Sequence, residues 1–260
     1  MGGPFAQRVK MAGAAVNGST HRLVAMLAMA CLDDDERRIV YPRWGAIDAG
    51  TTLSDEFRIM WEPAAAGSEE RELVHRCFVD SDDPRNHGGV TRSLDHAEGS
   101  ISFIQSFLDG ELEGSYTEDE FLEDLGMFVG VLSHHVADLC TPVHVGHKMD
   151  YGRVEGRSMA AFHGKVERDL GRLASRCSIG MSPARLVDVS REYFWSIAKD
   201  TYDTAFVRLE SVYRDGDDDA LLGIVSDRMT SAVRHTRDLW HTIFSRTNMT
   251  ARKWSLQPLL

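Results

Sequence analysis

Residues Ser133–Asp169 read SHHVADLCTPVHVGHKMDYGRVEGRSMAAFHGKVERD, and this stretch predicts both the fold and the functional site. It contains three histidines and two carboxylates at metal-ligand spacing: His134, Asp138, His144, His163 and Glu167. The first pair and the last pair are each four residues apart, so both members of a pair project from one face of a helix. Imidazole nitrogen and carboxylate oxygen are good donors to Zn²⁺, and rigid helices can fix their separation.

The surroundings of the first pair favour a metal over a surface contact. His134 and Asp138 lie in an apolar run that includes Val131, Leu132 and Val136. A pair on the solvated face of a helix would contribute only a few tenths of a kcal/mol. A buried carboxylate costs several kcal/mol unless a cation or another positive group offsets it. We therefore expect these side chains to bind a metal ion.

Helical patterns extend over most of the chain. Thr117 and Glu120 form a capping box before a long run of apolar residues at helical spacing. Ser182–Pro183 has the pattern of an N-cap followed by proline at the first helical position, which predicts a second helix start. Gly45–Ser54 is interpreted as a loop. The predicted fold class is all-α, a globular multi-helix fold with a polynuclear metal site between helices.

Composition narrows the function further. The 260 residues carry a formal net charge of −11, so duplex nucleic acid is not an expected partner. Eleven histidines against four cysteines favour histidine and carboxylate metal chemistry over a thiolate cluster. We expect one domain over residues 1–260, with residues 1–17 a candidate for disorder. No apolar run is long enough for a transmembrane segment.

One apolar segment has two interpretations. Leu23–Ala30 follows basic residues and ends in a small-residue pattern, as the apolar region of a secretory signal does. It equally suits the first buried helix of the domain. The helix interpretation predicts a cytoplasmic protein, and the signal interpretation predicts a secreted one; we favour the former.

The metal-ligand spacing resembles that of the bacterial zinc-dependent phospholipases C and the fungal single-strand-specific nucleases. That superfamily carries H-x3-D-x5-H, often with proline two residues before the last histidine, and a downstream H-x3-E. Here His134, Asp138 and His144 match the first motif, with Pro142 in place. The pair His163–Glu167 matches the second.

The resemblance implies further ligands upstream. His21, at the start of an apolar helix, looks like the N-terminal histidine ligand of the family, and His75 is similar to a second one. Asp55 follows a Gly-x4-Asp pattern and is preferred to Asp48 as the family's aspartate ligand. Family members also use an N-terminal tryptophan, whereas the first tryptophan here is Trp44, so the third metal site departs from the pattern.

By this resemblance the site would hold two or three zinc ions. The first would be bound by Asp55, His75, His134 and Asp138. The second would be bound by His144, His163 and Glu167. Asp138 would also reach a third ion held partly by His21.

The implied activity is hydrolysis of a phosphodiester by a zinc-activated water, as in a phospholipase C, with Asp55 as the catalytic proton acceptor. The substrate would be a small-molecule or lipid phosphoester. The alternatives are a single-strand nuclease or nucleotidase of the same superfamily, and a metal-binding scaffold adapted to another reaction.

Overall fold

A computed structural model describes residues 20–61, 88–112, 114–145 and 182–249, together with 165–166, 168–169, 171–173 and 176. Within these ranges only the helical backbone is described at 54–61 and 88–89. Every regular element in this part of the chain is helical and none is a strand, so the fold class is all-α, as the sequence predicts.

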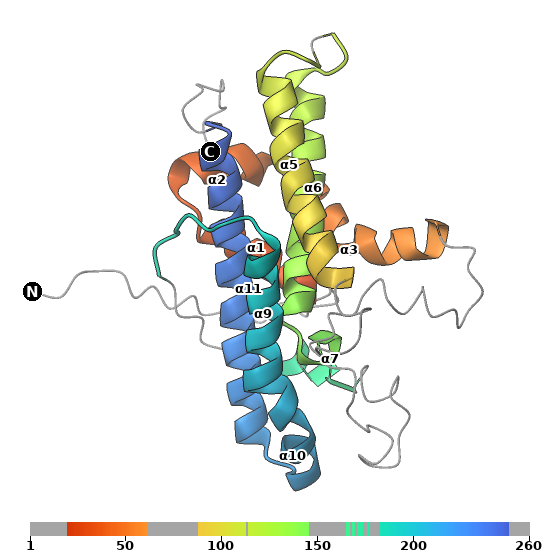
Figure 1. Cartoon of the computed structure of the whole chain (residues 1–260), viewed down its shortest axis with the longest axis vertical. Coiled ribbons are helices and arrows are strands. Elements are labelled where there is room, and N and C mark those ends of the chain that lie inside the picture. Colours follow the sequence, from red (N-terminus) through yellow and green to blue (C-terminus); the bar gives the residue numbers. More distant parts are fainter. Residues whose placement is uncertain are drawn as a thin grey trace, which may run out of the picture.

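The helices share one core and are listed here in chain order: α1 (Thr20–Ala30), α2 (Asp34–Val40), the 3-10 turn η1 (Tyr41–Arg43), α3 (Trp44–Trp61), α5 (Gly88–Leu108), α6 (Glu118–Leu139), α7 (Pro142–Val145), α9 (Arg191–Thr201), the π-helical turn η3 (Tyr202–Phe206), α10 (Val207–Asp215) and α11 (Asp218–Arg246). Figure 1 shows α5 and α6 side by side, with α9, α10 and α11 forming a second column along the long axis. Helix α6 contacts α1, α3, α5, α9 and α11, so its position organises the core.

The start of α6 follows the capping rule. Thr117 accepts the backbone N–H of Glu120, and the Glu120 carboxylate accepts the backbone N–H of Thr117. Two hydrogen bonds to the Glu120 carboxylate lower its pKa: the larger effect comes from the backbone N–H of Thr117 and the smaller from its hydroxyl. At the other end of α6 every residue from 133 to 139 is buried. His134 and Asp138, the predicted metal ligands on α6, therefore lie inside the core.

The expected loop at Gly45–Ser54 is wrong, because these residues are helical and belong to α3. Gly45 and Gly50 do not interrupt this helix. Gly50 instead packs directly against the backbone of α6, where any larger residue would collide with it. Tertiary packing outweighs the low helix propensity of glycine at this position.

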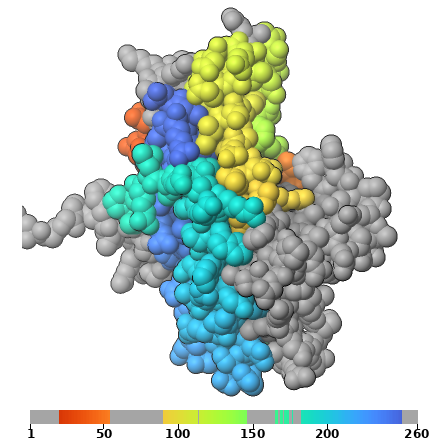
Figure 2. Space-filling model, in the orientation of Figure 1, coloured from red at the N-terminus to blue at the C-terminus, as the bar shows by residue number. Residues whose placement is uncertain are grey.

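The expected helix start at Ser182–Pro183 is also wrong. The segment 182–189 has no regular secondary structure, and α9 begins after Ser190, whose hydroxyl caps it. The buried Arg237 guanidinium of α11 donates to both carbonyls of Ser182–Pro183, and Asp238 accepts the backbone N–H of Arg185. Side chains of α11 thus satisfy the backbone groups that a helix would have paired internally. The segment crosses α11 in Figure 1 and covers it in teal in Figure 2.

The apolar segment Leu23–Ala30 forms most of α1, and its inward residues are part of the core. Helix α1 packs against α6 and α11. This is the arrangement that the helix interpretation predicts. In the described part of the chain, no helix combines the length and apolar character needed to span a bilayer.

Candidate metal centre

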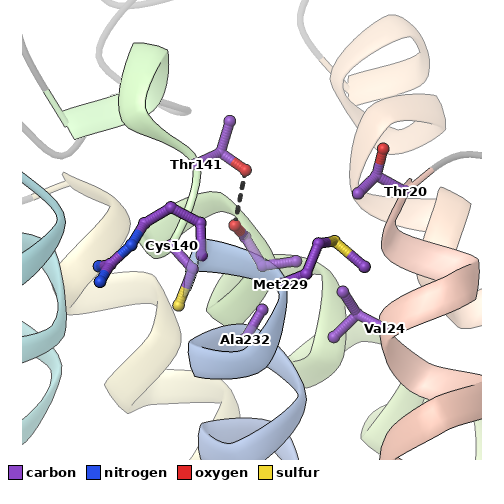
Figure 3. A pocket seen from close by; sticks show the side chains of 8 residues that line it. Thr20, Val24, Cys140, Thr141, Met229 and Ala232 are labelled. Carbon is purple, nitrogen blue, oxygen red and sulfur yellow. Dashed lines mark hydrogen bonds between the residues drawn. The ribbon is translucent and has the colours of Figure 1, made fainter. Parts of the chain in front are cut away.

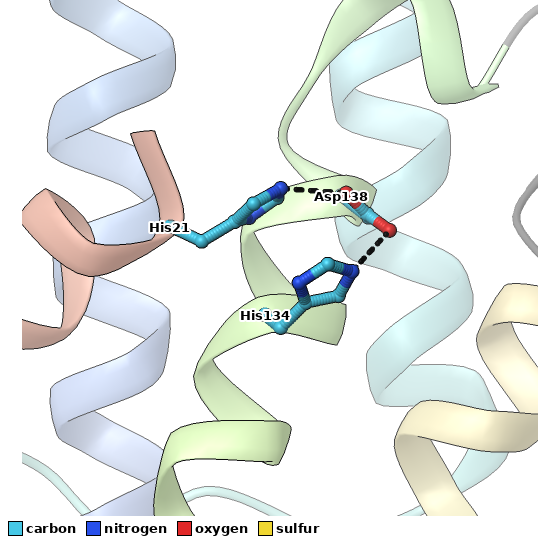
Figure 4. Close-up of side chains that lie close together, drawn as sticks. All are labelled: His21, His134 and Asp138. Atoms are coloured by element: carbon cyan, nitrogen blue, oxygen red, sulfur yellow. Dashed lines mark ion pairs between the residues drawn. The ribbon is translucent and has the colours of Figure 1, made fainter. Parts of the chain in front are cut away.

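Three imidazoles from three helices converge on one carboxylate. Helix α6 contributes His134 and Asp138, α1 contributes His21, and α7 contributes His144. The His134 Nε2 atom lies 3.3 Å from Oδ2 of Asp138. On the other side of the carboxylate, Oδ1 lies 3.5 Å from His21 Nε2 and 3.7 Å from His144 Nε2. Figure 4 shows His21 and His134 pointing at opposite oxygens of Asp138.

The group is withdrawn from water. His134 is 1% exposed, Asp138 5% and His144 8%. A carboxylate in such surroundings keeps its charge only if positive charge lies close to it, because desolvation otherwise favours the neutral acid. Neutral imidazoles do not supply that charge. Protonated imidazoles or a bound cation would supply it.

A backbone contact orients His134. Its Nδ1 atom lies 2.8 Å from the carbonyl oxygen of Thr51 in α3. Because a carbonyl oxygen can only accept, Nδ1 carries the hydrogen, and in the neutral ring Nε2 presents a lone pair. That lone pair faces Oδ2 of Asp138, which is also an acceptor. These two acceptor atoms attract each other only through a cation between them, either a proton or a metal ion.

The distances favour a metal ion as that cation. Two ligands of a tetrahedral zinc ion with bonds of about 2.0–2.1 Å lie roughly 3.3 Å apart. The contacts of His134 and His21 with Asp138 are close to this length, that of His144 is longer, and all three exceed the usual range of about 2.7–3.2 Å for an N–H···O hydrogen bond. Donors of His21, His134 and Asp138 all lie within 4.8 Å of one another and could hold a metal ion.

A second group of similar composition behaves differently. Asp33, Glu36 and His241 also bring donors within 4.8 Å. Here His241 Nδ1 lies 2.6 Å from the Glu36 carboxylate, which is a direct hydrogen bond, and Asp33 and Glu36 cap the start of α2. This group is therefore a hydrogen-bonded cap, whereas the contacts around Asp138 are longer than ordinary hydrogen bonds.

Ring stacking and an ion pair hold α1 against the site. The His21 and His134 rings stack with centroids 4.0 Å apart and planes inclined by 28°. The next residue, Arg22, places Nε 2.6 Å from Oδ1 of Asp48 in α3. The Asp48 carboxylate, the rival to Asp55 as a ligand, thus contacts a guanidinium that links α1 to α3.

His135 faces away from the carboxylate, as its position one residue after His134 in a helix predicts. It stacks instead on His96 of α5, with ring centroids 4.6 Å apart. Burial and then the neighbouring His134 hold the pKa of His135 well below its ordinary value. Burial and then Arg92 likewise lower the pKa of His96. These two rings are therefore neutral and pack behind the site.

A small pocket lies beside the site, between α1, the end of α6 and α11 (Figure 3). Thr20 and Ala137, the sequence neighbours of His21 and Asp138, line it together with Cys140 and Arg228. Burial raises the pKa of the Cys140 thiol to about 12. The free thiol is therefore protonated at neutral pH and is a poor nucleophile.

The structure does not describe the side chains of the remaining predicted ligands. Asp55 belongs to α3, one helical turn beyond Thr51 and on the same side of that helix. Its role as ligand and proton acceptor stays a prediction. His75, His163 and Glu167 lie outside the described residues, and so does the region 1–17. The structure brings together His21, His134, Asp138 and His144.

Residues next to the His163–Glu167 pair are anchored to α10. Val166 is in the core, and the Asp169 carboxylate accepts hydrogen bonds from Lys165 and from the hydroxyl of Tyr213, both at 2.9 Å. Burial alone would raise the pKa of Asp169, but these two hydrogen bonds lower it below its ordinary value. An ionised Asp169 therefore ties this part of the chain to α10.

Comparison with known proteins adds little to this description. No family model and no curated protein matches the chain. Among solved structures it is similar to the alpha-toxin of Clostridium perfringens from avian strain SWCP, at 13% sequence identity and a TM-score of 0.49. The match covers 89% of this chain and 66% of the toxin chain, so this chain spans just under two thirds of that protein's length.

Proposed function

We propose that this protein is a metal-dependent phosphoesterase, similar to a phospholipase C, with its metal centre at Asp138. The observation that carries the proposal is the oriented and buried His134–Asp138 pair, with His21 and His144 on the second carboxylate oxygen. The Nδ1–H group of His134 donates a hydrogen bond to a backbone carbonyl, as histidine ligands of metals almost always do through the nitrogen that does not bind the metal.

The donor set is best matched by zinc. The imidazole nitrogens of His21 and His134 and the carboxylate of Asp138 suit Zn²⁺, and no thiolate in the described part of the chain adjoins Asp138. When bound, zinc supplies an acidified water and positive charge that stabilises a phosphate ester under attack. Two or three ions would be accommodated if Asp55, His75, His163 and Glu167 join the described ligands.

The chain's own residues would perform three tasks. His21, His134 and Asp138 would hold the metal, with the two imidazoles on either side of the carboxylate. Asp55 would accept a proton from the attacking water. The buried residues at the end of α6 would exclude bulk water and so strengthen the electrostatic attraction between the site and a phosphate.

The substrate is proposed to be a small-molecule or lipid phosphodiester. With a net charge of −11, the protein repels long polyanions, so a single-strand nuclease or nucleotidase is the second choice. A phosphatidylcholine substrate compared with single-stranded nucleic acid, at equal enzyme and zinc concentrations, separates the two activities.

The test combines metal content and turnover. The purified protein should contain zinc by elemental analysis and hydrolyse bis(p-nitrophenyl) phosphate, and a chelator should abolish this activity reversibly. His134→Ala and Asp138→Ala should lose both properties. His241→Gln is the matched control, because it removes a histidine–carboxylate contact outside the site and should keep both. A protein that binds zinc but hydrolyses no phosphoester would instead support an adapted metal-binding scaffold.

A further inference from the structure

The crossing of α3 and α6 has no room for side chains at two positions. A Cβ atom added to Gly50 would lie 2.3 Å from the carbonyl oxygen of Met127, and one added to Gly130 would lie 2.2 Å from that of Ile47. The two glycine positions also face each other, since a Cβ on either would lie 3.0 Å from the Cα atom of the other. The obstacles are backbone atoms, which cannot rotate away as a flexible side chain can.

The glycine contact lies next to the contact that orients His134. Thr51 directly follows Gly50 in α3, and His134 lies one turn beyond Gly130 on the same side of α6. The Thr51 carbonyl accepts the His134 Nδ1 hydrogen at 2.8 Å across the two helices. The distance between the helix axes at the glycines therefore sets the length of this hydrogen bond.

We propose that Gly50 and Gly130 are positioning residues for the metal centre. Their contact brings the Thr51 carbonyl within reach of His134, which fixes the hydrogen on Nδ1 and turns Nε2 toward Asp138. The inference rests on the proposed metal centre only for its consequence in binding. The hydrogen position on His134 is a property of the metal-free protein.

The size of the expected effect follows from the distances. An ordinary contact of a Cβ atom needs 3.4 Å or more, so an alanine at Gly130 would push the helices apart by about 1 Å. The hydrogen bond to Thr51 would then lengthen from 2.8 Å to roughly 3.8 Å, beyond the usual limit of about 3.2 Å. Loss of such a supporting contact typically lowers metal affinity by about 10–100-fold.

The experiment compares four proteins, each freed of metal. Nitrogen-15 NMR of histidine-labelled protein reports which ring nitrogen of His134 carries hydrogen, and competition with a zinc-binding dye gives the zinc affinity. Wild type should show hydrogen on Nδ1. In Gly130→Ala and Gly50→Ala, the Nδ1 hydrogen should exchange faster and zinc affinity should fall at least about tenfold. The control is Gly99→Ala in α5, where an added Cβ meets nothing within 4 Å, and it should match wild type.

A milder variant covers the case in which the first two do not fold. Gly126→Ala lies one turn before Gly130 on α6, and its Cβ would meet the Ala46 side chain at 3.0 Å. We expect it to fold, with a loss of zinc affinity smaller than that of Gly130→Ala but larger than that of Gly99→Ala.

Two results would overturn the inference. One is wild-type protein with the His134 hydrogen on Nε2. The other is a folded glycine variant of this crossing with unchanged hydrogen exchange and unchanged zinc affinity. If none of the proteins binds zinc, the proposed function fails, but the NMR comparison still decides whether the glycines position His134.

Discussion

The Nε2 atom of His21 lies 3.5 Å from Oδ1 of Asp138, which joins the first described helix of the chain to the last turn of α6. The opposite oxygen of the same carboxylate faces His134. Because α1 and α6 are far apart in sequence, this contact depends on the completed core. Ligands drawn from separate helices would also link those helices when an ion binds.

Asp138→Asn should separate metal binding from folding. The amide removes a buried charge but keeps the shape, so bound zinc should fall to a small fraction of the wild-type content. Without metal, the variant should be as stable as metal-free wild type or more so, because no carboxylate remains to be desolvated. Calorimetry with and without chelator measures both effects. A variant that unfolds far below metal-free wild type would indicate that Asp138 has a structural partner instead.

Removal of zinc should destabilise wild-type protein. An ion that binds only the folded state adds about 4 kcal/mol when its free concentration is about a thousand times its dissociation constant. A chelator should therefore lower the melting temperature of wild type and leave that of Asp138→Asn unchanged. Equal melting temperatures of wild type with and without chelator would mean that the site holds no ion.

His235 should make the fold sensitive to acid. Burial, followed by the charge of Arg234, lowers the pKa of His235 to about 3, whereas the ring in an unfolded chain titrates at 6.5. The unfolded state therefore binds more protons between these values, and stability falls as the pH drops from about 6.5 toward about 3. The full difference is on the order of 5 kcal/mol.

The variant His235→Gln tests this dependence, because glutamine can keep a hydrogen bond to the hydroxyl of Tyr193, which now contacts His235 Nδ1 at 2.8 Å. Urea unfolding at about pH 7 and about pH 4, in chelator, should show a smaller loss of stability in the variant. Identical losses in both proteins would rule out His235 as the titrating group.

Arg237 should be essential for the segment over α11. Its guanidinium is fully buried, contacts the carboxylate of Asp238, and donates to the carbonyls of Ser182 and Pro183. Arg237→Leu leaves a buried carboxylate with weaker partners and should cost about 3–5 kcal/mol in urea unfolding. The double variant with Asp238→Leu should be more stable than the single variant. A single variant within about 1 kcal/mol of wild type would contradict this account.

Cys140 should resist modification in the folded protein. Its thiol is buried and its pKa is raised to about 12, so almost no thiolate exists at about pH 8. Mass spectrometry after treatment with iodoacetamide should show Cys140 unmodified without denaturant and fully modified in urea. Rapid labelling of the native protein would show that the pocket beside the site opens.

Short sequence patterns correctly predicted a helix end where the residues that cap the helix are close together in the chain. The capping box at Thr117 and Glu120 begins α6, and the apolar spacing along that helix correctly implies that His134 and Asp138 are buried. Ser182–Pro183 carries a similar local signal, yet it does not begin a helix, and Arg237 binds its carbonyls. A local pattern cannot reveal a competing partner that lies far along the chain.

The sequence by itself determined that the chain is helical, where α6 begins, and that a histidine and an aspartate share one buried face of it. These properties follow from hydrogen bonds and apolar periodicity within single helices. Only the tertiary structure decided that His144 lies beside the same oxygen of Asp138 as His21, and that the Thr51 carbonyl orients His134. The reason is physical: these contacts depend on how closely helices approach one another, and the contact of Gly50 with Gly130 has no signature in either helix alone.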